Sequence, residues 1–477
     1  MVILYIALAL LAVFIIIINV NAVKCKPKQT NESIIIEKLD INQDTATENL
    51  AKMIRCKTVS NKDYSKVDVS QFDKFITLLE TLYPTVHKKA TPEHIAGGLL
   101  YRIKGKSSNE PSVLMAHFDV VPVNENQWDV DPFGGVIKDG YLWGRGTLDT
   151  KCSLFGIMES AESLLKKGFV PQNDIYLSFG CNEEIAGDCA PSIVKALKER
   201  NVKPAFVLDE GGTILKSNFS FFPHNIAAIG IAEKGPMDVE LTVKAESGHA
   251  SQPPKHTAVG LLARDICKIE NHQFPMQMNP AVKAMILGLA PHSPYWGRLI
   301  MANLWCFSPL IKFICKQNKT TAALFRTSMA FTQTSGSNGA NVLPQQAKAV
   351  VNVRLASGCK SDDAVEHMKK AAGDPNLEMR IVNFSEATPC AAPDGKYWNI
   401  MAKAISENFD NTIVTPYLMM GGTDSRFFNE ITDNIYKFAP TLSGGGLLKT
   451  IHSDNERIRL DNIPGLINFY AGLMENL

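Results

Sequence analysis

The chain has 477 residues, of which 45% are hydrophobic and 20% are charged. This composition is typical of globular proteins and excludes a disordered or collagen-like chain. Lysine and arginine total 49 against 48 aspartates and glutamates, so the protein is not expected to bind nucleic acid through a clustered basic surface. None of the ten cysteines belongs to a C-x-x-C pair, which excludes a zinc ribbon or a thioredoxin-like site.

The N-terminal residues carry the one strong targeting signal. Every residue from Val2 to Ile18 is apolar or aromatic, which is nearly enough to span a bilayer. Val20 and Ala22 also fit the small-residue pattern of a signal-peptide cleavage site, whereas the lysines that follow favour a cytoplasmic body for an anchored chain. Residues 1–22 are therefore predicted to be a membrane anchor or a signal peptide, and the protein to be single-pass membrane-anchored or secreted.

The hydrophobic pattern of the next part of the chain predicts an α/β domain. Residues 23–44 are polar and are expected to form a linker. From residue 45 on, segments with helical and strand periods alternate, as in layered α/β proteins. The predicted helices are 45–55, 69–82, 152–167 and 191–200, and the predicted buried strands are 112–117, 174–180 and 204–208. Together they form the first part of a domain, residues 45–235.

The pattern changes between residues 236 and 385. Alternation in 238–245 and 347–355 is typical of half-exposed antiparallel strands. A helix is predicted near 258–270, and residues 281–316 are unusually apolar. After residue 386 the α/β pattern resumes, with predicted helices at 396–408 and 463–475 and strands at 412–418 and 434–438. The sequence thus predicts an α/β domain, residues 45–235 and 386–477, interrupted by a smaller α+β domain, residues 236–385.

Side chains that can bind a metal ion follow the predicted strands of the first part. His117 and Asp119 follow the first strand as H-x-D, Glu183 and Glu184 follow the second, and Asp209 ends the third. In an open α/β sheet, ligands bind beyond the carboxyl ends of the strands. We therefore expect these side chains to lie close together at one edge of the sheet.

Two further residues of this kind lie elsewhere in the chain. Asp149 is in a turn before the predicted helix 152–167, and His452 is near the C-terminus. Each residue alone has an ordinary structural explanation, since an aspartate among glycines often forms a turn or a helix cap. Together, two histidines and several carboxylates make a donor set suited to a divalent cation such as zinc.

At these residues the sequence is similar to a known family. The motifs are L-M-A-H-F-D-V-V-P, W-x-V-D-P-F-G-G, G-R-G-T-L-D-T-K, N-E-E, L-D-E-G-G, S-G-H-A-S-Q-P-P, N-V-L-P, G-G-T-D-S-R and I-H-S-D-N-E. From about residue 45 to the C-terminus they resemble the aminoacylase and carboxypeptidase S family of dinuclear zinc peptidases. Within it, they are most similar to the branch of carboxypeptidase S and N-fatty-acyl-amino acid synthase/hydrolase. The resemblance implies a zinc-peptidase catalytic domain with a mixed sheet flanked by helices.

The resemblance also implies two Zn²⁺ ions per subunit, with other divalent metals as an alternative. His117 and Asp209 would hold one ion, and Glu184 and His452 would hold the other. Asp149 would bridge the two ions. Two such ions can share a water molecule and lower its pKa toward about 7.

Three more residues take catalytic roles by the same resemblance. Asp119 would hydrogen-bond to His117 and fix its tautomer, and Glu183 would be the general base. His249 matches the histidine that family members aim at the scissile carbonyl, often from a partner subunit. Because no position of the core motif is missing, the sequence gives little support to a non-catalytic scaffold.

Substrate contacts are expected from the inserted domain and from a glycine-rich loop. Asn341 and Arg354 match family positions that contact polar groups of the substrate, and the planar guanidinium of arginine suits a free carboxylate. Arg354 on an alternating strand could instead be an exposed structural residue. Gly422 and Thr423 offer backbone donors in the loop G-G-T-D-S-R. The inserted domain, 236–385, resembles the family's lid or dimerisation domain, so a homodimer is one possible assembly.

The function expected from the resemblance is hydrolysis of the amide bond between an acyl or peptidyl group and a C-terminal free amino acid. The substrate would be a small molecule or a peptide with a free carboxylate. An N-fatty-acyl-amino acid synthase/hydrolase is one specific alternative, and the apolar stretch 281–316 suits an acyl chain, although it could equally be packed core. A biosynthetic deacetylase on the same scaffold is another alternative, which the apolar N-terminus disfavours.

Overall fold

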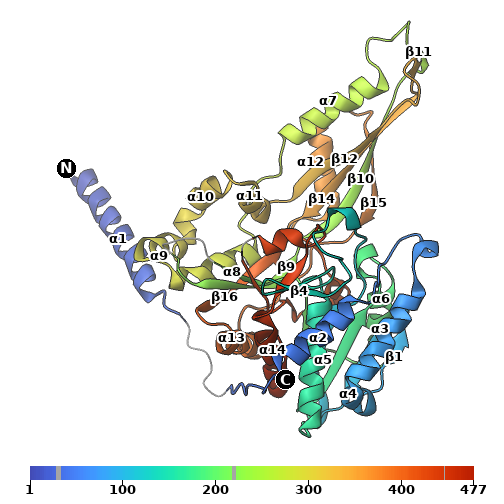
Figure 1. Ribbon diagram of the computed structural model, residues 1–477. Helices are drawn as coiled ribbons and strands as arrows, with labels where there is room; N and C mark the ends of the chain where they lie inside the picture. Colours follow the sequence, from blue (N-terminus) through green and yellow to red (C-terminus); the bar gives the residue numbers. More distant parts are fainter. Residues whose placement is uncertain (28–33, 217–221, 445) are drawn as a thin grey trace.

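A ten-stranded mixed sheet and a four-stranded antiparallel sheet organise the chain (Figure 1). The computed structural model describes residues 1–27, 34–216, 222–444 and 446–477. The large sheet lies at the centre of what we call the main domain. The small sheet belongs to the inserted domain, which extends away from the main domain together with helix α7. This is the α/β architecture with an inserted α+β domain that the sequence predicts.

The large sheet has parallel strands at its centre. Its strands, from one edge to the other, are β1 (Glu93–Ile95), β2 (Gly98–Ile103), β6 (Asn173–Gly180), β3 (Ser107–His117), β7 (Phe206–Asp209), β17 (Ile435–Lys437), β9 (Asn225–Glu233), β8 (Ile214–Leu215) and β18 (Leu442–Ser443), with β16 (Thr412–Met419) beside β9. Strand β3 pairs in parallel with both β6 and β7. The carboxyl ends of these three strands therefore meet at one edge, as the sequence predicts.

Helices cover both faces of the large sheet. On one face α5 is almost completely buried, and it contacts α14, α2, α4 and β3. Gly156 allows the close approach of α5 and α14, since a Cβ there would lie 2.1 Å from Leu466 Cδ2. Helix α6 packs on the opposite face. The main-domain helices are α2 (Gln43–Ile54), α3 (Val69–Leu82), α4 (Pro84–Lys89), α5 (Lys151–Lys166), α6 (Cys189–Glu199), α13 (Gly395–Asn408) and α14 (Asn462–Asn476).

The inserted domain has its own hydrophobic core. Its sheet has the order β12 (Ser328–Ser335), β14 (Gln346–Leu355), β10 (Gly235–Lys244) and β15 (Glu378–Phe384). Burial alternates along β14, which is the reason that its sequence alternates between apolar and polar residues. Helices α7 (Ala258–Asn271) and α12 (Ser361–Ala372) contact this sheet. A two-stranded ribbon, β11 (Gly248–His249) and β13 (Val342–Leu343), lies at the far end of the domain (Figure 1).

A helical segment inside the predicted range of the inserted domain packs on the main domain instead. It comprises α8 (Pro280–Leu289), α9 (Tyr295–Met301), α10 (Leu304–Cys315) and α11 (Lys319–Phe325). Val282 and Ile286 of α8 belong to the core of the main domain, and Gly288 lies directly against Thr415 of β16. The range 236–385 predicted for the inserted domain is therefore too broad, because the apolar residues of α8 complete the larger core.

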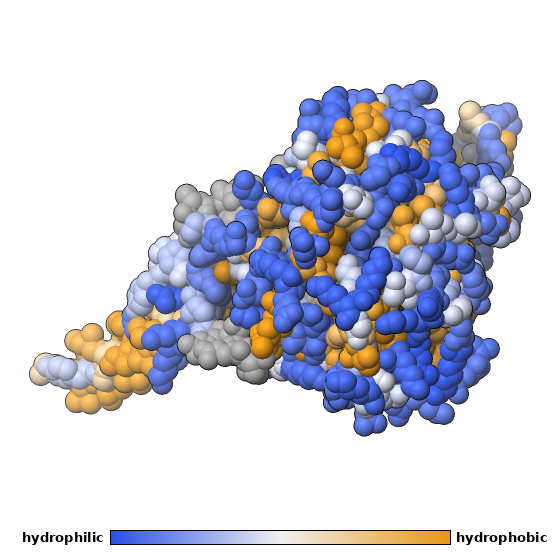
Figure 2. Space-filling view, turned by 60° about the horizontal axis from the view of Figure 1, so that its bottom comes forward, coloured by the Kyte–Doolittle hydropathy of each residue, from blue (hydrophilic) through white to orange (hydrophobic). Residues whose placement is uncertain are grey.

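The apolar N-terminus is one helix, α1 (Val2–Lys24), which is almost entirely exposed. In Figure 2 an apolar projection leaves one side of the molecule, where Figure 1 places α1. In the described part of the chain, α1 is the one unbroken helix that is long and apolar enough to cross a membrane. Residues 28–33 of the predicted linker, 23–44, lie outside the described residues.

Candidate metal centre and active site

His117 ends the central strand β3, and Asp119, two residues later, holds its imidazole ring in place. Its Nδ1 lies 3.0 Å from the backbone oxygen of Asp119 and 3.4 Å from Asp119 Oδ1. Because Nδ1 donates to these oxygens, Nε2 is left to face the acidic residues of the site. The side chains of both residues are buried.

Asp119 also positions the two glutamates that follow β6. Its Oδ1 accepts a hydrogen bond from the backbone N–H of Glu183 at 3.1 Å, and its Oδ2 accepts one from Glu184 at 3.2 Å. These residues begin the short 3₁₀ helix η3 (Glu183–Ile185). A single buried carboxylate thus ties the end of β3 to the end of β6.

Asp149 lies between the two histidines. Its Oδ1 is 3.1 Å from His117 Nε2, and its Oδ2 is 3.0 Å from His452 Nε2. His452 Nε2 is also 3.0 Å from Glu184 Oε2. One carboxylate that presents a different oxygen to each of two imidazoles has the geometry of a bridging metal ligand.

The strand end of β7 presents Glu210, and not Asp209, to His117. Glu210 Oε1 is 3.2 Å from His117 Nε2. Asp209 Oδ2 accepts a hydrogen bond from the backbone N–H of Ser425 at 2.9 Å. Successive side chains at a strand end point in opposite directions, so only one of the two adjacent carboxylates can face the site. This geometry favours Glu210 over the predicted residue Asp209 as a metal ligand.

The glutamates of the cluster are crowded, and one buried oxygen among them has no hydrogen-bond partner in the described part of the chain. Two groups of possible ligand atoms share His117. In one, His117, Glu183 and Glu210 have ligand atoms within 4.8 Å of one another, and in the other His117, Asp149 and Glu184 do. The buried Glu184 Oε1 has no hydrogen-bond partner among the described residues. Four carboxylates and two imidazoles with a buried oxygen left unpaired fit a pair of divalent cations by donor type.

The protonation of these groups reflects their crowding. Burial, with a smaller contribution from the carboxylate of Asp149, raises the pKa of Glu183 to about 8. Hydrogen bonds to Asp149 and Glu184 raise the pKa of His452 to about 10. Burial alone would lower the pKa of His117, but neighbouring carboxylates raise it well above its usual value. A metal ion that binds at these imidazoles would compete with the protons that the neighbouring carboxylates favour.

A buried ion pair that we did not assign a role from the sequence holds the loop before α5. Glu456 Oε2 lies 2.6 Å from Arg145 Nη1. Glu456 Oε1 accepts hydrogen bonds from the backbone N–H groups of Leu148 at 2.7 Å and Asp149 at 3.2 Å. Both charged side chains are buried. Glu456 is the last residue of the motif I-H-S-D-N-E, so the motif contains the signal, although the spacing alone does not reveal the partner.

His249 and Asn341 lie close to each other but not in the metal cluster. His249 pairs with Val342 in the ribbon of β11 and β13, and the backbone N–H of Ala250 donates to the backbone oxygen of Asn341 at 2.9 Å. His249 and Asn341 are exposed, and His249 lies in the ribbon at the far end of the inserted domain (Figure 1). The chain therefore brings these two predicted residues together without bringing them to the acidic cluster.

The other predicted substrate residues lie where the two domains meet. Arg354 is half-buried near the end of β14, opposite Pro236. Thr423 is buried, and its backbone N–H and hydroxyl both donate to Glu233, at 3.1 and 2.8 Å. Gly422 lies beside Arg426, because a Cβ at this position would be 2.6 Å from Arg426 Nη1. The donors of Thr423 are thus already used within the protein.

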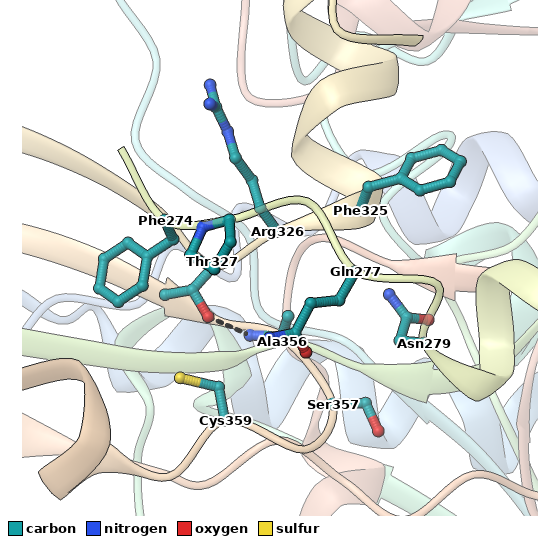
Figure 3. Close-up of a pocket in the computed structure, with 10 residues that line it drawn as sticks. Phe274, Gln277, Asn279, Phe325, Arg326, Thr327, Ala356, Ser357 and Cys359 are labelled. Carbon is teal, nitrogen blue, oxygen red and sulfur yellow. Dashed lines mark hydrogen bonds between the residues drawn. The ribbon is translucent and has the colours of Figure 1, made fainter. Parts of the chain in front are cut away.

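A small cavity of about 30 Å³ also lies at this junction (Figure 3). In the wall of this cavity, the Thr327 hydroxyl oxygen accepts a hydrogen bond from the backbone N–H of Ala356 at 3.0 Å. The Arg326 side chain extends away from the other labelled residues. None of the lining residues belongs to the acidic cluster, so this cavity is not the candidate active site.

The sequence profile of peptidase family M20/M25/M40 matches residues 113–476, which include the strands and loops just described. The chain belongs to this family. Members of the M20 family are peptidases and related amide hydrolases, and this M20 chain is a hydrolase of that family. The resemblance to the carboxypeptidase S branch is confirmed by the relatives described next.

Three curated relatives of this M20 chain are similar over most of their length. The probable carboxypeptidase S-like 2 of Dictyostelium discoideum is 35% identical over 90% of this chain and 84% of the relative. The N-fatty-acyl-amino acid synthase/hydrolase PM20D1 of Xenopus tropicalis is 34% identical over 94% of this chain and 88% of the relative. Carboxypeptidase S of Saccharomyces cerevisiae is 29% identical over 91% of this chain and 84% of the relative.

Solved structures confirm the M20 fold. An M20 metallo-carboxypeptidase of Sulfolobus solfataricus matches with a TM-score of 0.63 at 16% identity, over 90% of this chain and 98% of the other. A dinuclear metal-binding M20 peptidase of Bacillus subtilis matches with a TM-score of 0.55 at 15% identity, over 90% and 98%. At these identities the likeness concerns the fold, which is the predicted mixed sheet with flanking helices.

Proposed function

We propose that the protein is a zinc-dependent amidohydrolase that cleaves the amide bond between an acyl or peptidyl group and a C-terminal free amino acid. The observation that carries this proposal is the position of Asp149, whose two oxygens face His117 Nε2 and His452 Nε2 at 3.1 and 3.0 Å. The names of the relatives, carboxypeptidase S and N-fatty-acyl-amino acid synthase/hydrolase, describe the same bond class.

The proposed ligand set differs from the predicted one at a single position. His117 and Glu210 would hold one zinc ion, Glu184 and His452 would hold the other, and Asp149 would bridge them. Glu210 takes the place predicted for Asp209, because it is the Glu210 oxygen that lies 3.2 Å from His117. Asp119 would act through His117 and through the start of η3, which it holds by two backbone hydrogen bonds.

Glu183 is the residue best placed to move protons. It lies in a group of possible metal ligands with His117 and Glu210, but the ligand set proposed above does not use it. When bound, a pair of divalent cations supplies a water of lowered pKa and polarises the substrate carbonyl. The Glu183 carboxylate would take the proton of the attacking water and return it to the leaving amine nitrogen.

The identity of the acyl group separates the two candidate activities. An N-fatty-acyl-amino acid hydrolase needs an apolar surface for the acyl chain, and the sequence suggested residues 281–316 for it. In this stretch α8 is packed against β16, and most of the exposed apolar side chains lie on α9 and α10. A peptide carboxypeptidase needs the same amino-acid end but no long apolar groove. A biosynthetic deacetylase would prefer a short acyl group.

A hydrolysis panel tests the proposal and separates these candidates. One amino acid is offered to the zinc-loaded protein with acyl chains of increasing length and as the C-terminal residue of a dipeptide. Each buried CH₂ contributes about 0.8 kcal/mol, so kcat/KM would rise about tenfold for every two carbons until the acyl site is filled. A flat series with good dipeptide cleavage would indicate a peptidase, and activity only on N-acetyl substrates would indicate a deacetylase. No hydrolysis of any member would overturn the proposal.

Arg354→Ala is expected to penalise free-acid substrates far more than the matching carboxamides. Arg354 is half-buried at the junction of the two domains and can bind a carboxylate through its planar guanidinium. The measurement is kcat/KM for each acid and amide pair, with Arg380→Ala on the edge strand β15 as the control. Arg380 is 70% exposed and pairs with Glu240, so its loss should leave both substrates unchanged. Equal losses on acid and amide would remove Arg354 from this role.

We propose that His249 reaches the active site from the partner subunit of a homodimer. The outer strands β12 and β15 of the inserted sheet each pair on one side only among the described residues, and open strand edges are sites of association. His249 lies on the exposed ribbon of the same domain, outside the cluster of its own chain. A second chain could bring that ribbon over the site.

His249→Ala is expected to lower kcat by about 10²–10³-fold without loss of metal, because one donor to the developing oxyanion is removed. Mixing this variant with Glu183→Gln tests the source of the histidine. In a mixed dimer, the site that retains Glu183 would receive an intact His249 from the other chain, so activity would return. If mixing restores nothing although mixed dimers form, His249 does not act across subunits. Metal loss in His249→Ala would instead assign it a structural role.

A further inference from the structure

The exposed face of α10 is apolar, contrary to the usual pattern of a surface helix. Trp305, Leu310, Phe313 and Ile314 are 61%, 42%, 66% and 57% exposed. Trp305 and Phe313 are eight residues apart and Leu310 and Ile314 are four apart, which places the four side chains within one half of the helix surface. The opposite pattern, with the apolar stripe toward the core, is expected for a soluble surface helix. We call this set of four side chains the α10 stripe.

The α10 stripe is continuous with α1. The ring of Trp305 lies 5.8 Å from the ring of Phe14 in an edge-to-face arrangement. Asn303, just before α10, accepts a hydrogen bond from Asn21 at 2.8 Å and donates one to the Ile18 backbone oxygen at 3.0 Å. These contacts attach the C-terminal half of α1 to α9 and α10, which lie on one side of it (Figure 1).

The length of α1 determines how deep this contact would lie in a bilayer. The part of α1 that precedes the contact, residues 2–13, is about 18 Å long at 1.5 Å per residue. The hydrocarbon core of a bilayer is about 30 Å thick. If α1 crosses the bilayer, the core must therefore extend past Phe14 toward Asn19. At that depth Trp305 is surrounded by lipid rather than by water.

The charges around the stripe agree with this placement. Lys316 and Lys319 follow α10 directly and are exposed. Lys24 ends α1, and the two asparagines Asn19 and Asn21 that precede it make hydrogen bonds to Tyr295 and Asn303. Lysine and tyrosine side chains are typical of the boundary between lipid and water. Cationic side chains thus lie at the C-terminal ends of both α1 and α10, Lys24 in the first helix and Lys312 in the second.

We propose that α1 and the α10 stripe form one membrane-facing surface, in which the near leaflet of a phospholipid bilayer covers Trp305, Leu310, Phe313 and Ile314. The main domain is then held against the membrane by two contacts instead of by a single flexible tether. This inference concerns the attachment of the protein, and a stripe covered by lipid would not serve as the acyl-chain surface of the active site.

Tryptophan quenching in nanodiscs tests the proposal on the full chain. The protein is placed in phosphatidylcholine nanodiscs with or without brominated lipid, and the quenched fraction of its tryptophan emission is measured. We expect brominated lipid to quench the wild type, and Trp305→Phe to remove much of that quenching. Trp143→Phe is the matched control, because Trp143 lies on β5 (Tyr141–Trp143) in contact with Arg457. Equal quenching of the wild type and Trp305→Phe would overturn the proposal.

A charge placed in the stripe gives a second, independent measurement. Phe313→Asp should release α10 from lipid and lower the quenching of Trp305, while Val170→Asp, at an apolar position of the main domain that is 51% exposed, should not. Hydrolysis of a soluble substrate by each variant shows that the fold is intact. Two results contradict the proposal. The mass of the purified protein could show that residues 1–22 have been removed, so that α1 cannot anchor it. Alternatively, the protein could form a dimer in detergent that Phe313→Asp dissociates, which would assign the stripe to contact with a second copy.

Discussion

A Glu183→Gln variant is expected to lose about 10²–10⁴-fold in kcat while it retains its metal, because a glutamine amide cannot accept the proton of the attacking water. Glu183 lies in a group of possible metal ligands with His117 and Glu210, but neither proposed ligand set uses its oxygens. The measurement combines steady-state rates on the best substrate of the panel with metal analysis of the purified protein. Near-native turnover would remove Glu183 from the role of general base.

Glu184→Gln is the matched control, because it changes the adjacent carboxylate by the same single atom. Glu184 Oε2 lies 3.0 Å from His452 Nε2 and its Oε1 is buried without a partner among the described residues. This variant is therefore expected to lose metal together with activity. If both variants lose metal to the same extent, the division of the two glutamates into a base and a ligand is incorrect.

The strands that carry the site could be predicted because they are buried on both faces. The sequence predicted strands at 112–117, 174–180 and 204–208, and the structure has them as β3, β6 and β7. Continuous apolar runs of this length identify central parallel strands, and the residues that follow them must meet at one edge. His117 and Glu184 could thus be placed in one cluster without a structure.

The choice between Asp209 and Glu210 could not be made in the same way. Both carboxylates follow β7 directly, and the direction of each side chain depends on where the strand ends. The hydrophobic pattern gives that position only to within a residue or two. The hydrogen bond from the Ser425 backbone, which turns Asp209 away from the site, joins segments 216 residues apart in the sequence and leaves no local signal.

The helices α8 to α11 were misplaced for a related reason. An apolar stretch indicates that residues are buried or bound, but it does not say against which domain. Ile286 packs into the main core, whereas Phe313 on α10 is 66% exposed, although both residues lie in the same apolar stretch of sequence. Only the contacts of α8 with β16 distinguish the two.

The position of Asp149 depends on a residue more than 300 positions away. The carboxylate of Glu456 accepts the backbone N–H groups of Gly146, Leu148 and Asp149. It therefore acts as a positioning residue, since it holds the loop that presents Asp149 to both histidines. Its charge is balanced by Arg145 at 2.6 Å in a pair that is almost completely buried. Such a pair is costly to break, because the remaining charge stays buried without a partner.

Glu456→Ala is expected to lower the free energy of unfolding by about 3–5 kcal/mol, and to weaken metal binding by about 10–100-fold because a group that orients a ligand is lost. Denaturant unfolding of the metal-free protein and metal titration of the folded protein measure the two effects separately. The matched control is Glu430→Ala, which breaks the exposed ion pair of Glu430 with Lys198 and should cost less than about 1 kcal/mol.

The double variant Arg145→Met/Glu456→Ala distinguishes positioning from simple charge balance. Removal of both charges should recover part of the lost stability, because no unpaired charge remains buried. Metal affinity should stay low, because the backbone N–H groups of Leu148 and Asp149 still lack their acceptor. If metal affinity recovers together with stability, Glu456 contributes only the partner of Arg145, and the position of Asp149 must be fixed by the start of α5 instead.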